Sequence, residues 1–336
     1  MNKKLNDIEK YRKDDMKSRK HDNDDAYLDF DRIKTEQINP DTVDIDSRST
    51  TEMLKMINNE DKKVAGAVEK ALPEIAAAVD IITDRFKKGG RLIYIGAGTS
   101  GRLGVLDATE CPPTYGVPRG MVTGIIAGGI NAFGTAIEGI EDNAEAGAAD
   151  IEHMSVSNKD TVVGISSSGH APYVDGAMKK ASEKGAATVL ITNSENSEIS
   201  LTADITITLQ TGPEVIMGST RMKAGSAVKM TLNMLTTASM IKFGKVYKNL
   251  MIDMEPSNSK LWARAVRMLM LASDAERSVA ENALEIAGGN LRKAIVKIAE
   301  GTRFEEAEQK PVMSRGVMRE AIQRKPARGR QSKSGV

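Results

Sequence analysis

The 336-residue sequence has little of several features that mark large classes of protein. It has one cysteine, Cys111, which excludes a disulfide framework and suits a reducing compartment. No apolar run is long enough to span a bilayer, and the charged N-terminus lacks the apolar centre of a signal peptide. The net charge is only +1, so no global field favours nucleic acid. These absences predict a cytoplasmic protein that binds neither membrane nor nucleic acid.

What the sequence does contain is an alternation of short apolar runs with amphipathic stretches. Such βαβ alternation predicts an α/β fold, in which a five-stranded parallel sheet is covered by helices on both faces. The predicted strands cover residues 92–95, 121–127, 161–165, 187–192 and 205–209. The predicted helices cover residues 50–59, 61–88 with Pro73 as a kink or junction, 131–138, 142–153, 172–184 and 219–243, and a further helix follows Thr99 or Ser100 and ends near residue 110.

Composition divides the chain into four segments. Residues 1–32 are dense in charge with few apolar residues, which predicts a disordered or loosely helical extension. Residues 33–255 hold an extended arm, the first helices and the sheet. Residues 256–322 show only helical patterns and predict a small helical domain. Residues 323–336 are basic and predict a frayed tail, whereas a nucleic-acid arm is less favoured because no aromatics are interleaved.

A glycine-rich loop, Gly96-Ala97-Gly98-Thr99-Ser100-Gly101, follows the first predicted strand. Its glycines permit a tight turn close to a ligand, and Thr99 or Ser100 is expected to cap the next helix. The free N–H groups of a helix N-terminus, with hydroxyls beside them, suit a phosphate. The loop also fits the dinucleotide fingerprint, but the acidic residue expected about 20 positions later is missing. A phosphate monoester is therefore favoured over NAD.

A second hydroxyl loop, Ser166-Ser167-Ser168-Gly169, follows the third predicted strand. Ligands of parallel sheets bind at the carboxyl ends of the strands, so both loops are expected at one edge of the sheet. Two such loops favour a shared phosphate site. The alternative is that each set of hydroxyls merely caps a helix.

Acidic and basic residues supply further candidates. Pro112 and Pro113 predict that the helix after the glycine loop ends at Glu110, where the dipole disfavours a carboxylate. Ser219 is predicted to cap the last helix of the sheet region, with Arg221 and Lys223 in its first turn. An anionic ligand would offset the unfavourable dipole at these cations, and a salt bridge to a neighbouring carboxylate is the alternative. The three histidines have no metal-ligand spacing.

Three stretches carry a resemblance to a known family. They are GRLIYIGAGTSGRLGVLDATECPPTYG, the region from Ile126 to Asp142, and GSTRMKAGSAVKMTLNMLTTASMIKFGKVYKNLM. Over roughly Ile33 to Ala321 the chain resembles the N-acetylmuramic acid 6-phosphate etherases, which are similar in turn to the glucokinase regulatory protein and to sugar isomerase (SIS) domains. The resemblance implies an SIS-type, flavodoxin-like sheet, a homodimer, no metal or other cofactor, and a role in recycling cell-wall amino sugars.

The reaction that the resemblance implies removes D-lactate from the C3 ether of the sugar phosphate and adds water, giving N-acetylglucosamine 6-phosphate. The family's first acid matches Glu110, which would protonate the departing lactate oxygen and then activate water. Its second acid matches Glu141, which would take the C2 proton. The residues expected to bind the amino-sugar 6-phosphate are Gly98, Thr99, Ser100, Ser166, Ser167, Ser168, Gly169, Ser219, Arg221 and Lys223.

One departure and two alternatives remain at this point. SIS loops often continue Ser-Gly-x-Thr, but His170 and Ala171 follow Gly169 here, so one phosphate-holding hydroxyl is either absent or supplied elsewhere. A non-catalytic sugar-phosphate sensor would keep the binding loops without needing the two acids together. An aldose–ketose isomerase would act on the same class of substrate and yield a ketose.

Overall fold

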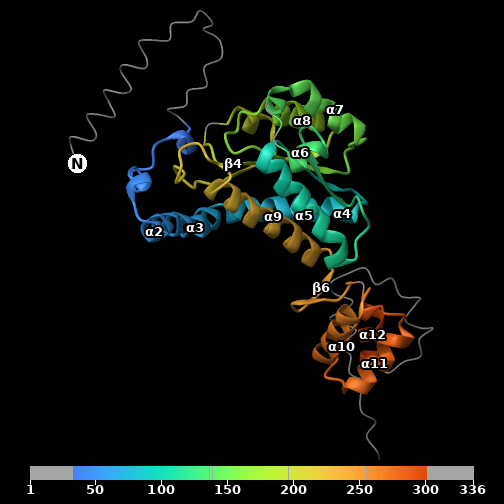
Figure 1. Ribbon diagram of the computed structural model, residues 1–336. Helices are drawn as coiled ribbons and strands as arrows, with labels where there is room; N and C mark the ends of the chain where they lie inside the picture. The colour runs from blue at the N-terminus through green and yellow to red at the C-terminus, as the bar shows by residue number, and fades with distance from the viewer. Residues whose placement is uncertain (1–32, 136, 138, 196, 255, 301–336) are drawn as a thin grey trace, which may run out of the picture. The chain divides into compact units, whose positions relative to one another are not determined.

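The computed structural model describes residues 33–300, apart from 136, 138, 196 and 255. The predicted extension over 1–32, residues 301–322 of the predicted helical domain and the basic tail lie outside this range. A five-stranded, wholly parallel sheet in the order β2-β1-β3-β4-β5 lies at the centre (Figure 1). Its strands are β1 (Leu92–Gly96), β2 (Val122–Ile126), β3 (Thr161–Ile165), β4 (Ala187–Thr192) and β5 (Ile205–Thr208). The predicted flavodoxin-like sheet is confirmed.

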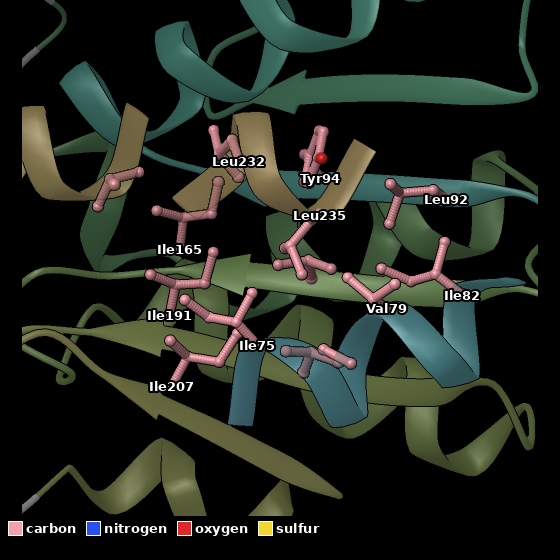
Figure 2. Close-up of a cluster of buried hydrophobic side chains, with 14 of the residues drawn as sticks. Ile75, Val79, Ile82, Leu92, Tyr94, Ile165, Ile191, Ile207, Leu232 and Leu235 are labelled. Atoms are coloured by element: carbon pink, nitrogen blue, oxygen red, sulfur yellow. The ribbon is translucent and has the colours of Figure 1, made fainter. Parts of the chain in front are cut away.

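Helices cover both faces of the sheet because its strands are apolar on both sides. One face packs against α4 (Leu72–Lys87), α5 (Gly98–Tyr115) and α9 (Lys223–Lys242). The other packs against α7 (Ala144–His153) and α8 (Pro172–Glu183). Figure 2 shows the first of these cores, where side chains from the strands meet those of α4 and α9; it labels Ile75, Val79, Ile82, Leu92, Tyr94, Ile165, Ile191, Ile207, Leu232 and Leu235.

The predicted helix over 61–88 is two helices in the structure. The first, α3 (Lys63–Lys70), ends before Ala71, and α4 begins at Leu72. Pro73 lies in the first turn of α4, where a proline is tolerated because the backbone N–H it lacks would have no partner inside the helix. Pro73 therefore marks a junction, one of the two outcomes that the sequence left open.

The prediction that the helix after the glycine loop ends at Glu110 is wrong. Helix α5 continues through Pro112 and Pro113 to Tyr115. It ends at Gly116, which has a left-handed φ of 57° and donates its N–H to the carbonyl of Pro112 at 2.9 Å. Because both prolines fall in the final turn, only two helical hydrogen bonds are lost and the helix survives. Glu110 thus lies more than one turn inside the helix.

Other elements differ from the predictions at their ends. The predicted helix over 131–138 is limited to α6 (Asn131–Gly134), and the one over 219–243 begins later, as α9. A hairpin of β6 (Val246–Tyr247) and β7 (Leu250–Met251) was not predicted. The helical pattern predicted for residues 256–322 is confirmed as far as residue 300, where three helices share a core of their own. They are α10 (Ser259–Ser273), α11 (Arg277–Ile286) and α12 (Leu291–Glu300).

The chain before α4 forms an arm and a capped helix. The arm covers Ile33 to Arg48 and contains two 3₁₀ turns. Helix α2 (Thr50–Asp61) follows, and Ser49 caps it by accepting the N–H of Glu52, whose carboxylate accepts the N–H of Ser49 in return. Within the described residues, no helix has the length and apolarity that a membrane span requires.

Candidate functional site

The sheet order places the candidate site between two particular strands. From β1 the chain first adds β2 on one side and then crosses back to add β3 on the other. In sheets of this order the crevice at such a reversal, beyond the carboxyl ends of the strands, is where ligands bind. Gly96 at the end of β1 lies in register with Ile165 at the end of β3. The glycine loop and the serine loop, which follow these two residues, therefore begin side by side.

The glycine loop leads directly into α5. Ala97 occupies the capping position and offers no side-chain hydrogen bond, so the prediction that Thr99 or Ser100 caps the helix is wrong. Both residues lie inside the first turn and are half-buried. Gly101 packs so closely that a Cβ there would lie 2.4 Å from the carbonyl oxygen of Gly96. The first N–H groups of α5 and two hydroxyls thus gather at the crevice, a combination that suits a phosphate.

The serine loop is held by its own hydrogen bonds. The Ser166 hydroxyl accepts the N–H of Gly169 at 3.1 Å, and the Ser168 hydroxyl accepts the N–H of His170 at 3.3 Å. Gly169 has a φ of 75°, and a Cβ there would lie 2.5 Å from the side chain of Ser197. A hydroxyl that accepts one N–H keeps its own hydrogen to donate, so both serines can still bind a phosphate oxygen.

The two acidic candidates lie on different elements of the chain. Glu110 is exposed in the second half of α5, twelve residues after Gly98, a distance of about 18 Å along the helix. Glu141 is exposed in a short 3₁₀ helix, η4 (Ile140–Asp142), which follows α6 and precedes α7. Glu110 therefore lies far down α5 from the phosphate loops of its own chain.

The segment from Ser219 to Lys223, at the start of α9, differs most from its prediction. Lys223 is the first residue of α9, so Ser219 and Arg221 precede the helix and neither is in its first turn. The Lys223 ammonium is 1% exposed and lies 2.6 Å from the Glu60 carboxylate of α2, which is 3% exposed. The structure thus shows the salt bridge that the sequence left as the alternative. Ser219 is half-buried and Arg221 is exposed.

Two carboxylates in this region were missed by the sequence analysis. Glu214, which is fully buried, accepts the N–H groups of Lys223 at 3.0 Å and Ala224 at 2.9 Å and so caps α9. Burial raises the pKa of Glu214, although these hydrogen bonds oppose the rise. Burial likewise raises the pKa of Glu60, but hydrogen bonds from Lys223, Lys63 and Asn39 outweigh it and lower the pKa to about 2. Only the need of α9 for a capping anion could have suggested Glu214 from sequence.

Comparisons with known proteins agree with this geometry. A family model described as the glucokinase regulatory protein N-terminal SIS domain matches residues 74–182, and an SIS domain model matches residues 132–238. A phosphoheptose isomerase structure from Francisella tularensis is similar over 56% of this chain and all of its own, with 16% identity and a TM-score of 0.42. The sheet, with its two loops at the β1/β3 crevice, has the SIS-type fold.

Curated relatives identify the family within this class. An N-acetylmuramic acid 6-phosphate etherase from Actinobacillus pleuropneumoniae is 53% identical over 87% of this chain and 96% of its own length. The enzymes of the same name from Caldanaerobacter subterraneus and Clostridioides difficile are 51% and 52% identical, over 88% and 87% of this chain and 97% and 96% of their own. The chain belongs to the N-acetylmuramic acid 6-phosphate etherase family.

Proposed function

We propose that this protein is a carbon–oxygen lyase that converts N-acetylmuramic acid 6-phosphate and water into N-acetylglucosamine 6-phosphate and D-lactate. The observation that carries the proposal is the identity of about half of all residues with etherases over nearly their whole length. The crevice between β1 and β3, with its uncapped helix start and two hydroxyl loops, supplies a place for the 6-phosphate. We place the protein in the cytoplasm, in the recycling of cell-wall amino sugars.

The reaction proceeds by elimination and then hydration. The sugar opens to its aldehyde, which acidifies the proton on C2. Glu141 takes this proton, the C3–O bond breaks, and Glu110 protonates the departing lactate oxygen. Glu110 then takes a proton from water as the oxygen adds to C3, and Glu141 gives its proton back to C2, so both acids return to their starting states. General acid–base groups of this kind contribute about 10²–10⁴-fold each.

The position of Glu110 makes a homodimer part of the proposal. Within one chain Glu110 lies about 18 Å along α5 from the start of the phosphate site, farther than a sugar phosphate reaches. Leu106 shares its helix face, because it precedes Glu110 by four residues, and is 41% exposed, whereas Leu103 packs partly on the core of its own chain. A second copy packed on this face would cover Leu106 and bring Glu110 of one chain to the phosphate site of the other.

The first test is direct. Purified protein incubated with N-acetylmuramic acid 6-phosphate, in the presence of a chelator and without nucleotide, is expected to release D-lactate. The Glu110→Gln variant is expected to lose turnover by at least about a hundredfold while still binding N-acetylglucosamine 6-phosphate. The exposed Glu69→Gln change on α3 is the matched control and should leave both unchanged. Absence of lactate from the wild-type protein would refute the proposal.

A second test asks whether the site is shared between subunits. Glu110→Gln and Glu141→Gln chains are unfolded together and refolded as a mixture. If each site combines Glu110 of one chain with Glu141 of the other, half of the dimers are mixed and each has one intact site, so about a quarter of wild-type activity returns. If both acids act within one chain, the mixture stays inactive.

A further inference from the structure

The most deeply buried cation among the described residues begins α9. The Lys223 ammonium lies 2.6 Å from one carboxylate oxygen of Glu60, and Lys63 lies 2.6 Å from the other. Lys63 reaches the solvent and also pairs with Asp41 of the arm at 3.0 Å. A buried charge is tolerated only when it is paired and hydrogen-bonded, as it is here. The pair joins the end of α2 to the start of α9, 163 residues later in the chain.

Glu214 closes the chain before α9 into a loop. Its carboxylate accepts the N–H groups of Lys223 and Ala224, so residues 215–222 leave and return to the same point. This stretch, called the 215–222 loop below, contains Ser219 and Arg221, both of which are expected to bind the substrate. With its ends tied together, the loop has few ways to move except as a unit.

The arm holds the 215–222 loop from outside. The Thr42 hydroxyl donates to the carbonyl of Val215 at 2.8 Å, and the N–H of Gly218 donates to the carbonyl of Thr35 at 3.1 Å. Gly218 has a φ of 73°, a conformation that favours glycine, and it lies close to the arm, because a Cβ there would lie 2.7 Å from the Glu36 carboxylate. The loop is therefore clamped between the arm and the start of α9.

On its other side the loop meets the phosphate site. The N–H of Gly225 donates to the carbonyl of Thr220 at 2.8 Å. A Cβ on Gly225 would lie 3.5 Å from the side-chain methyl of Thr99, in the first turn of α5. The start of α9 and the carbonyl of Thr220 at the end of the loop therefore lie close to Thr99 of the glycine loop. A shift of Lys223 would be passed to the spacing between Thr99 and the 215–222 loop.

We propose that Glu60 and Lys223 form a positioning pair, which fixes the 215–222 loop against the glycine loop so that Ser219 and Arg221 face the substrate phosphate. Lys223 does not touch the substrate in this arrangement, because its ammonium is enclosed with Glu60. The inference rests on the proposed function, since it assigns the phosphate end of the same site.

The test compares the variants Glu60→Gln, Lys223→Met and the double change. Glu60→Gln leaves the buried Lys223 ammonium without its carboxylate partner, and Lys223→Met leaves Glu60 without that ammonium. The double change removes both charges and is the variant expected to fold well. Circular dichroism and thermal melting establish the fold. The KM for N-acetylmuramic acid 6-phosphate is expected to rise about tenfold or more with kcat within about threefold, because uniform binding of the phosphate is lost.

A merely structural role would lower the amount of active protein, and hence the apparent kcat, but leave KM unchanged. An unchanged KM in the folded double variant would therefore overturn the proposal. So would a lower KM in Glu60→Gln, since this would mean that a freed Lys223 binds the substrate itself. The matched control replaces the exposed Lys242–Asp80 pair, which joins α9 to α4, by methionine and asparagine and should leave KM unchanged.

The positioning pair can still be tested if the proposed etherase activity is absent. If the wild-type protein releases no lactate, the dissociation constant of N-acetylglucosamine 6-phosphate, measured by calorimetry, replaces KM. A weakening of about tenfold in the folded double variant would support the positioning pair even then. Equal binding by the wild-type and double-variant proteins would reject it.

Discussion

The phenol of Tyr94 on β1 donates a hydrogen bond of 3.0 Å to the buried carboxylate of Asp107 on α5. Thr236 of α9 donates to the other carboxylate oxygen at 3.3 Å. Burial raises the pKa of Asp107, although these two hydrogen bonds oppose the rise. Asp107 lies one turn before Glu110, so this contact fixes the part of α5 that carries the proposed acid.

The Tyr94→Phe variant is expected to lose about 1–3 kcal/mol of unfolding free energy, because a buried carboxylate loses a donor. The loss should be larger at pH 7 than at pH 4. Removing the donor raises the folded-state pKa of Asp107 further, and a raised carboxyl pKa costs stability as the pH rises through it. Urea unfolding at both pH values measures this. Tyr115→Phe removes a hydroxyl that donates to the uncharged Thr237 at 3.2 Å, and it should lose stability equally at both pH values.

Ser100→Ala is expected to raise the KM for N-acetylmuramic acid 6-phosphate about tenfold with little change in kcat. The hydroxyl lies in the first turn of α5 and is not used for capping, so we expect it to donate a hydrogen bond to the phosphate. Steady-state lactate release measures both constants. Ser182→Ala, an exposed change on α8, is the control. An unaltered KM would remove Ser100 from the site.

Two glycine-to-alanine changes should shift the free energy of unfolding in opposite directions. A Cβ on Gly124 of β2 would lie 2.5 Å from backbone atoms of Val105, so Gly124→Ala must push α5 from the sheet and should cost about 1–3 kcal/mol or more. Gly66 lies inside α3 with no atom within 4 Å of its added Cβ. Gly66→Ala should stabilise by about 0.5–1 kcal/mol, because alanine favours helix. Chemical unfolding of both variants measures the two free-energy changes and shows whether each has the expected sign.

Acid should weaken the protein through Glu60. Its pKa falls from 4.5 to about 2 in the folded state, which corresponds to about 3 kcal/mol of stability. A lowered carboxyl pKa stabilises fully above the unfolded value, so this contribution is present above about pH 5 and is lost as the pH falls toward 2. Urea unfolding of the wild-type protein should show this loss between pH 5 and 3. Glu60→Gln should show a shallower pH dependence, and identical slopes would contradict the assignment.

The sequence predicted the sheet well because each strand is a short apolar run between glycine-rich or polar turns. The run Thr161–Ile165, for example, is buried at every position, as expected for a parallel strand covered on both faces. The same regularity placed the two hydroxyl loops at one edge. Those loops follow directly from β1 and β3, so local pattern and sheet topology together were sufficient.

Local rules failed where distant residues decide the outcome. The end of α5 could not be read from Pro112 and Pro113, because Gly116 ends the helix where a Cβ would lie 2.2 Å from the carbonyl oxygen of Asp253. The start of α9 depends on Glu214, and the partner of Lys223 is Glu60, far earlier in the chain. No spacing rule links residues separated by 163 positions.

The contacts between the arm and the 215–222 loop also constrain the order of events during synthesis. Thr42 and Asn39 bond to backbone atoms 173 and 174 residues later. At 5–20 residues per second, the arm waits roughly 10–35 s on the ribosome for these partners to be made. The first of the described segments to be synthesised is thus among the last to form its contacts, and the nascent protein stays incomplete until α9 has emerged.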